Sequence, residues 1–141
     1  MDSLKYFFKE NVKPVENEKI VISDRFKDEN GNIIEWEIKP ISNEQDDRLR
    51  EKHTRQEKLK KGVYVPKFDY LAYLKDFLTS CVVFPNLNNK ELQDNYNVMT
   101  PEELLSAMLL PGEYNTLAEE AKNICGFDKD PLEEKIDEAK N

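Results

Sequence analysis

The sequence has few of the residues from which cofactor and metal sites are built. Its 141 residues include four glycines, two cysteines and one histidine. A phosphate-binding loop needs several closely spaced glycines, and a zinc site needs clustered cysteine or histidine ligands. The sequence has no Gly-rich loop, no CxxC motif and no HExxH motif. We therefore expect no cofactor and no metal ion, and we assign no residue to either role.

Candidate catalytic groups are equally scarce. A Cys–His nucleophile would require His53 to meet Cys81 or Cys125, but both cysteines lie on apolar helical faces, where we expect buried free thiols. His53 lies in a polar segment and is expected at the surface. The carboxylate pairs Asp46-Asp47 and Glu133-Glu134 lie on polar faces, which are typical of solvated charge. The sequence therefore predicts no catalytic residue and no enzyme.

Long apolar runs are also lacking. No stretch is long enough to span a bilayer, and residues 1–8 lack the apolar core of a signal peptide. The net charge is −8, which repels the phosphates of nucleic acids. We therefore expect a protein of the cytoplasm that binds neither membrane nor nucleic acid, with a basic or partly apolar protein as its partner.

The residues that are present suit one domain of modest size. Hydrophobic residues make up 38% and charged residues 35% of the chain, and an aromatic content of 10% argues against full disorder. From Asp128 the chain turns acidic and has few apolar residues. We predict a single α+β domain over residues 1–127, an acidic tail over 128–141, and mobile termini.

Residues 1–19 are predicted to form a short helix followed by a link. Leu4, Phe7 and Phe8 share one face of an amphipathic helix, and Pro14 interrupts the polar residues that follow. This apolar face has two interpretations. It docks on the domain, or it binds a partner.

Residues 20–39 alternate between apolar and polar side chains in the manner of a β-hairpin with an Asn30-Gly31 turn. A two-stranded hairpin is marginal alone, so its apolar face must pack on helices or on another chain. Its single tryptophan is more typical of a core than of a binding site. The alternating apolar side chains are Ile20, Ile22, Phe26, Ile34, Trp36 and Ile38.

Residues 43–127 are predicted to be mostly helical. Ser42 with Gln45 forms a capping-box pattern, which opens a polar helix over about 43–55. A basic run then indicates a mobile loop over 56–66. A solvated loop is the default interpretation, and contact with an acidic protein surface is the alternative.

The later helices are more apolar. Residues 68–84 are predicted to form one central buried helix, because apolar residues cover more than half of its circumference. Thr100 with Glu103 is another capping-box pattern. Further helices are predicted over 90–96, from Pro101 until Pro111 disfavours a helical Leu110, and over 113–124, the last followed by Gly126 as its C-terminal cap. The predicted fold is α+β and mostly α, with an N-terminal β-hairpin packed on a C-terminal bundle of about four helices.

Four segments form a distinctive pattern through their order and spacing. They are 25–32 (RFKDENGN) with 35–38 (EWEI), 82–87 (VVFPNL), 91–99 (ELQDNYNVM), and 104–114 (LLSAMLLPGEY) closed by Gly126-Phe127. Together they resemble the XkdN-like tail assembly chaperones of phages and prophages of Gram-positive bacteria. The resemblance runs from about residue 20 to about residue 127. The basic loop and the tail after Asp128 match no motif of that family.

The resemblance implies a non-catalytic role in building a long phage tail. Proteins of this family are understood to engage the tape measure protein, to help bring tail tube subunits to it, and to be absent from the finished virion. A chaperone also needs apolar surface held on a soluble body. We therefore expect partners in the tape measure and tail tube proteins, with possible self-association. The expected partner-binding residues are Leu4, Phe7, Phe8, Ile22, Trp36 and Ile38.

An acidic protein-interaction module, such as a DNA mimic that inhibits a host factor, is the alternative function. The net charge of −8 motivates it. A mimic wants an unbroken negative face, and the basic run before Gly62 argues against one.

Overall fold

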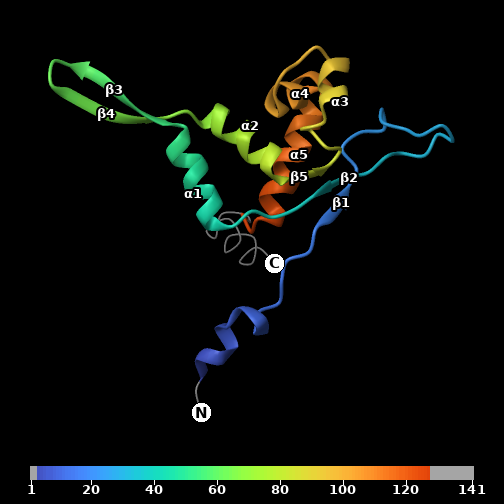
Figure 1. The fold of residues 1–141 in the computed structure, drawn as a ribbon, viewed down its shortest axis with the longest axis horizontal. Helices are drawn as coiled ribbons and strands as arrows, with labels where there is room; N and C mark the ends of the chain where they lie inside the picture. Colours follow the sequence, from blue (N-terminus) through green and yellow to red (C-terminus); the bar gives the residue numbers. More distant parts are fainter. Residues whose placement is uncertain (1–2, 128–141) are drawn as a thin grey trace, which may run out of the picture.

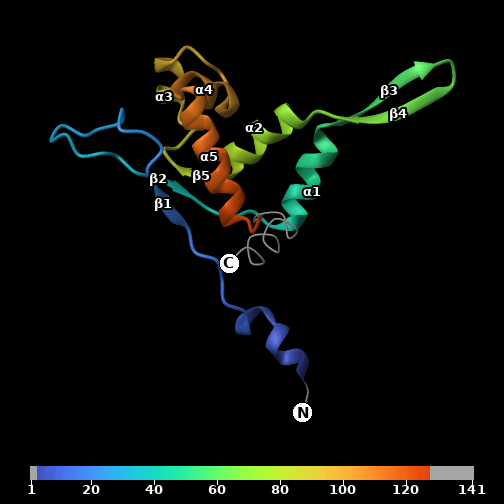
Figure 2. The ribbon, with the colours of Figure 1, turned by 180° about the vertical axis from the view of Figure 1, so that it is seen from behind.

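The computed structural model describes residues 3–127. The predicted acidic tail, 128–141, lies outside the described residues. Figure 1 shows a body of helices and a small sheet, from which the N-terminal residues, the β3–β4 hairpin and the loop between β1 and β2 project. Figure 2 shows from behind that these projections point in different directions. The predicted α+β class is confirmed.

An antiparallel sheet with strand order β1-β2-β5 forms one side of the body. Its strands are β1 (Glu18–Ile20), β2 (Trp36–Ile38) and β5 (Val82–Phe84). In β1 and β2, Ile20 lies opposite Trp36, so the predicted hairpin exists with shorter strands. Strands and helices therefore interleave along the chain, and the hairpin is not a separate N-terminal unit.

The third strand, β5, corrects the prediction of one helix over residues 68–84. The helix ends at Cys81, and Val82 already has an extended backbone. Adjacent β-branched residues favour a strand, and Pro85 disfavours a helical conformation at Phe84. Pairing with β2 then supplies the backbone hydrogen bonds that a longer helix would have made.

The loop between β1 and β2 turns around Asp28. Its carboxylate accepts hydrogen bonds from the backbone of Asn30 at 2.8 Å and of Asn32 at 2.9 Å. Gly31 has φ +81°, a conformation that glycine adopts without steric cost. The predicted turn is confirmed.

Five α-helices complete the described part of the body, where the sequence predicted about four. Helix α1 ends before the predicted position because the chain enters strand β3 at Thr54. Helix α5 begins two residues earlier than predicted, with Pro111 as its first residue. The helices are α1 (Asn43–Lys52), α2 (Tyr70–Cys81), α3 (Lys90–Asn95), α4 (Pro101–Met108) and α5 (Pro111–Ile124).

The predicted caps position these helices. The Ser42 hydroxyl accepts from the Gln45 amide at 3.2 Å, and Gln45 Oε1 accepts from the Ser42 amide at 3.0 Å. At α4, the Thr100 hydroxyl accepts from the Glu103 amide at 3.1 Å. Such caps satisfy amides that have no partner within the helix. Both hydroxyls therefore cap their helices as predicted, and at Ser42 the reciprocal bond of the capping box is also present.

The core lies between the sheet and helices α2, α4 and α5. The apolar face of the β1–β2 hairpin packs in this core. Packing on helices was one of the two alternatives that the sequence left open. The largest fully buried side chains are Trp36, Phe77, Ile38, Leu78, Leu104, Leu105, Leu117 and Cys81.

The predicted mobile loop over residues 56–66 is wrong, because these residues form a two-stranded antiparallel hairpin of β3 (Thr54–Lys60) and β4 (Val63–Phe68). Gly62, with φ +77°, makes the turn. Valine and tyrosine residues in β4 favour a strand. Neither strand contains a buried residue, so the hairpin extends into solvent (Figure 1).

Buried Asp46 joins α1 to α2. The Tyr73 hydroxyl donates a hydrogen bond to Asp46, and Arg50 Nε donates to the same carboxylate at 2.9 Å. Burial and the bond to Asp46 raise the pKa of Tyr73 above its ordinary value, so the phenol stays protonated as a donor. The buried carboxylate is therefore paired on both sides, as a buried charge requires.

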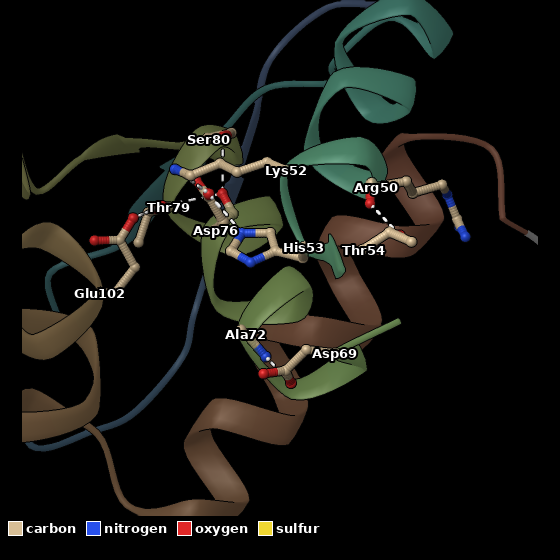
Figure 3. Close-up of polar contacts among 10 residues, drawn as sticks. All are labelled: Arg50, Lys52, His53, Thr54, Asp69, Ala72, Asp76, Thr79, Ser80 and Glu102. Carbon is tan, nitrogen blue, oxygen red and sulfur yellow. Dashed lines mark hydrogen bonds and ion pairs between the residues drawn. The ribbon is translucent and has the colours of Figure 1, made fainter. Parts of the chain in front are cut away.

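A second buried carboxylate, Asp76, joins α2 to the end of α1. Its Oδ2 lies 2.8 Å from Lys52 Nζ and 2.9 Å from His53 Nε2 (Figure 3). The His53 side chain is only 17% exposed, which corrects its expected surface position. Burial acts to raise the pKa of Asp76, but the hydrogen bonds from Lys52 and His53 outweigh it and hold the pKa below its ordinary value.

Asp76→Asn should lower the free energy of unfolding by about 1–2 kcal/mol at neutral pH, because two donors lose a charged acceptor. The folded pKa of Asp76 is depressed, so its contribution is present above the unfolded pKa of about 3.9 and disappears as the pH falls through the folded value. Urea unfolding of both proteins from neutral pH to about pH 3 measures the gap between them, which should shrink below about pH 4.

Asp47→Asn, at an exposed carboxylate of α1, is the matched control and should leave stability nearly unchanged. A gap between Asp76→Asn and the parent protein that stays constant through the acid range would contradict this assignment.

Candidate partner-binding surface

The N-terminal segment, residues 3–12, contains Phe7, the most exposed aromatic side chain of the described chain. It forms two 3-10 turns, Ser3–Phe7 and Lys9–Asn11, in place of the predicted α-helix. Phe7 is 80% exposed, and Leu4 and Phe8 are also exposed. The segment points away from the body in both views (Figures 1 and 2). Of the two sequence interpretations, docking on the domain is therefore not what the structure shows.

Three residues of the expected partner-binding set lie in the core, where the sequence analysis favoured placing Trp36. Ile22 is 6%, Trp36 1% and Ile38 0% exposed, so all three belong to the core. The addition of β5 and the packing of the helices cover the face that the sequence left open for a partner. These side chains do not form an exposed surface, and only Leu4, Phe7 and Phe8 of the expected set do so.

Beside the β1–β2 hairpin lies an apolar groove with a volume of about 310 Å³. Trp36 contributes to its wall, and Phe84, which is exposed, forms another part of it. Two basic residues, Arg25 and Lys27, stand at the groove. Its lining residues are Arg25, Phe26, Lys27, Ile34, Trp36, Phe84, Pro85, Leu92 and Met108.

All four sequence segments described above contribute to this groove. The first supplies Phe26 and Trp36, the second Phe84, the third Leu92 and the fourth Met108. Sequence reasoning assigned these residues to separate elements and did not predict that they meet. Pairing of β5 with β2 brings the segments together, and no local pattern encodes that pairing.

An ion pair fixes one end of the groove. Arg25 Nε donates to Glu113 Oε2 at 2.9 Å, and Arg25 Nη2 donates to the Met108 carbonyl at 3.0 Å. Glu113 Oε1 also accepts from the Leu110 amide at 2.7 Å. The hydrogen bond from Arg25 is the main reason that the pKa of Glu113 falls to about 2. The corner between α4 and α5 is thereby tied to the loop between β1 and β2.

The His53–Asp76 pair has the geometry of a base and its orienting carboxylate, but it lacks a nucleophile. The nearby hydroxyls of Thr79 and Ser80 donate to the Asp76 carbonyl at 3.0 and 2.7 Å (Figure 3). Within the described residues, neither hydroxyl is hydrogen-bonded to His53. The contact between His53 and Asp76 joins the end of α1 to α2.

The two thiols are close in space. Cys81 Sγ and Cys125 Sγ lie 3.9 Å apart, and both cysteines are free. Cys81 is buried as expected, and burial raises the pKa of its thiol. Cys125 is only half-buried, which corrects its predicted burial. Within residues 3–127, no group of three or more His, Cys, Asp or Glu side chains is placed to hold a metal ion.

Among the described helices, none has the length and apolar character needed to cross a membrane.

Known proteins with similar sequences match nearly the whole chain. Residues 4–140 match the family described as "Phage XkdN-like tail assembly chaperone protein, TAC". The chain is 31% identical over 139 residues to the phage-like element PBSX protein XkdN of Bacillus subtilis (strain 168), which covers 98% of this chain and 93% of XkdN. It is also 31% identical over 139 residues to the uncharacterized protein YqbN of the same organism.

A solved structure agrees with the sequence relatives. The fold is similar to the crystal structure of the protein YqbN with a TM-score of 0.76 and 25% sequence identity, covering 91% of this chain and 99% of that one. The family match and the alignment with XkdN both include the residues of the body and of the groove. The chain belongs to the XkdN-like phage tail assembly chaperone family, a non-catalytic family.

Proposed function

We propose that this chain binds the tape measure protein of its phage and helps to bring tail tube subunits to it during tail assembly. The observation that carries the proposal is the N-terminal segment, which holds Leu4, Phe7 and Phe8 in solvent away from the body. Exposed aromatic side chains on a soluble protein mark an interaction site. Membership of the family supports partners among the tail proteins.

The groove beside Trp36 supplies a second contact for the same partner. Its walls are apolar, and its volume of about 310 Å³ suits one or two side chains of a bound segment. Ile22 and Ile38 are buried in the core and do not line this groove. The N-terminal segment and the groove together give a partner two separate contacts, and linked weak contacts raise overall affinity.

The charge of the chain fits this role. A net charge of −8 keeps a protein with exposed aromatic residues soluble in the cytoplasm of the bacterial host. The chaperone leaves before the virion is complete. The exposed basic hairpin β3–β4 interrupts the negative surface, which favours a chaperone over a DNA mimic.

Phe7→Ser/Phe8→Ser should reduce co-purification with the tape measure protein by about tenfold or more, because each exposed phenylalanine that becomes buried contributes about 1.5–3 kcal/mol. Co-expression of the two genes followed by pull-down and quantitative gel analysis measures the recovery. The thermal unfolding midpoint should not change, because neither side chain is in the core.

Leu71→Ser/Met99→Ser is the matched control, since it removes two other exposed apolar side chains from the body. It should leave recovery at the level of the parent protein. Equal recovery of the tape measure protein by the Phe7→Ser/Phe8→Ser variant would refute this role for the N-terminal segment.

Phe84→Ser tests the groove separately. We expect recovery of the tape measure protein to fall by about threefold to tenfold, because the variant loses part of an apolar wall. Val83→Ser is the control on the same strand: Val83 is exposed but does not line the groove. If both variants lower recovery equally, the loss reflects damage to β5 and the groove has no specific role.

A further inference from the structure

The two cysteines lie side by side in the body, at the ends of two helices that are far apart in the sequence. Cys81 is the last residue of α2, and Cys125 follows the last residue of α5. Their Sγ atoms lie 3.9 Å apart, and both thiols are free. The sulfurs of a disulfide are about 2 Å apart, so these two atoms need to approach by about another 2 Å. Rotation of one side chain about its Cα–Cβ bond covers such a distance.

Backbone hydrogen bonds hold both cysteines at these positions. The Cys81 carbonyl accepts from the Lys39 amide at 2.8 Å, which ties the end of α2 to the residue after β2. The Cys125 amide donates to the Ala121 carbonyl at 3.2 Å, at the end of α5. Both bonds involve only the main chain, so either side chain can rotate without breaking them. The fold therefore keeps the two thiols at a high effective concentration towards each other.

The two thiols differ in their access to solvent. Cys81 is 0% exposed, and burial raises the pKa of its thiol, which makes it a poor first nucleophile. Cys125 is half-buried and lines a small pocket with a volume of about 80 Å³, to which Ser42 and Asn43 add polar groups. A water molecule takes up about 30 Å³ in the liquid, so a hydrogen peroxide molecule, which is slightly larger, fits in this pocket. A small oxidant therefore reaches Cys125 first.

We propose that a peroxide oxidises this pair to an intramolecular disulfide between Cys81 and Cys125. The Cys125 sulfur attacks one peroxide oxygen and breaks the O–O bond, which gives a sulfenic acid, and the leaving oxygen takes up the thiol proton. The Cys81 sulfur then attacks the Cys125 sulfur and breaks the S–O bond, and the hydroxide leaves as water with the Cys81 proton. The two thiols lose two electrons and two protons, and the peroxide gains them. The sequence contains no third cysteine to compete within the chain.

The disulfide fixes a junction on which the fold depends. Cys81 directly precedes β5, the strand whose pairing with β2 joins the β1–β2 hairpin to the helices. A bond to Cys125 ties this point to the end of α5. The two cysteines are 44 positions apart, so the bond also restricts the unfolded chain and stabilises the folded one. A reducing cytoplasm keeps both thiols free, and peroxide converts the chain to the cross-linked form. This conversion does not depend on tape measure binding.

The experiment treats the reduced full chain with hydrogen peroxide and maps its peptides by mass spectrometry without reduction. We expect the peptides that contain Cys81 and Cys125 to appear as one linked pair, about 2 Da lighter than the two reduced peptides together, because two hydrogens are lost. Dithiothreitol should restore both thiols. The proposal would be overturned by two free thiols after treatment, by loss of the thiols without a linked pair, or by a disulfide between two copies.

Two variants test the order of the steps. In Cys81→Ala, oxidation of Cys125 should stop at the sulfenic acid, which dimedone captures. In Cys125→Ser, the buried Cys81 should react with peroxide at least about tenfold more slowly than Cys125 does in the other variant. Equal rates would overturn the assignment of Cys125 as the first nucleophile. The linked peptides of the parent protein test the disulfide itself even where Cys81→Ala does not fold.

Thermal unfolding tests the effect on the fold. Oxidation of the parent protein should raise its Tm by about 5–15 °C, because the link restricts the unfolded chain. Cys125→Ser treated with the same peroxide is the matched control: it keeps the three methionines, which peroxide also oxidises, but it cannot form the link. Its Tm should not rise. An unchanged Tm in the oxidised parent protein would contradict the stabilisation of this junction.

Discussion

Strand β5 has only three residues, yet its pairing with β2 joins the N-terminal hairpin to the helices that follow. Without it, β1 and β2 would form a two-stranded ribbon, which is marginal in water. With it, Trp36 and Ile38 are enclosed by the sheet and the helices. The same pairing places Phe84 and Pro85 beside Phe26 and so forms one wall of the groove. The stability of the hairpin and the existence of the groove thus depend on one contact between distant parts of the chain.

The polar junctions between helices follow from the composition of α1. This helix offers almost no apolar residue to the core, so it cannot be held by hydrophobic burial alone. Asp46 and Asp76 replace that burial with paired, hydrogen-bonded carboxylates at both ends of its contact with α2. Such junctions are directional, because each needs a specific donor geometry. They hold α1 against α2, and the β3–β4 hairpin follows directly from the end of α1.

Local signals in the sequence were sufficient for much of the body. The Ser42 and Thr100 caps, the turn at Asp28 and the glycine after α5 depend on residues a few positions apart, and all are found. The strand β5 was not predictable in this way, because apolar residues over 68–84 satisfy a helical pattern equally well until the pairing with β2 is known. A core position for Trp36 was favoured by the sequence, but the strand that helps to enclose it was not. The β3–β4 hairpin was missed because it has no buried face, and alternation of apolar residues is the main signal of a strand.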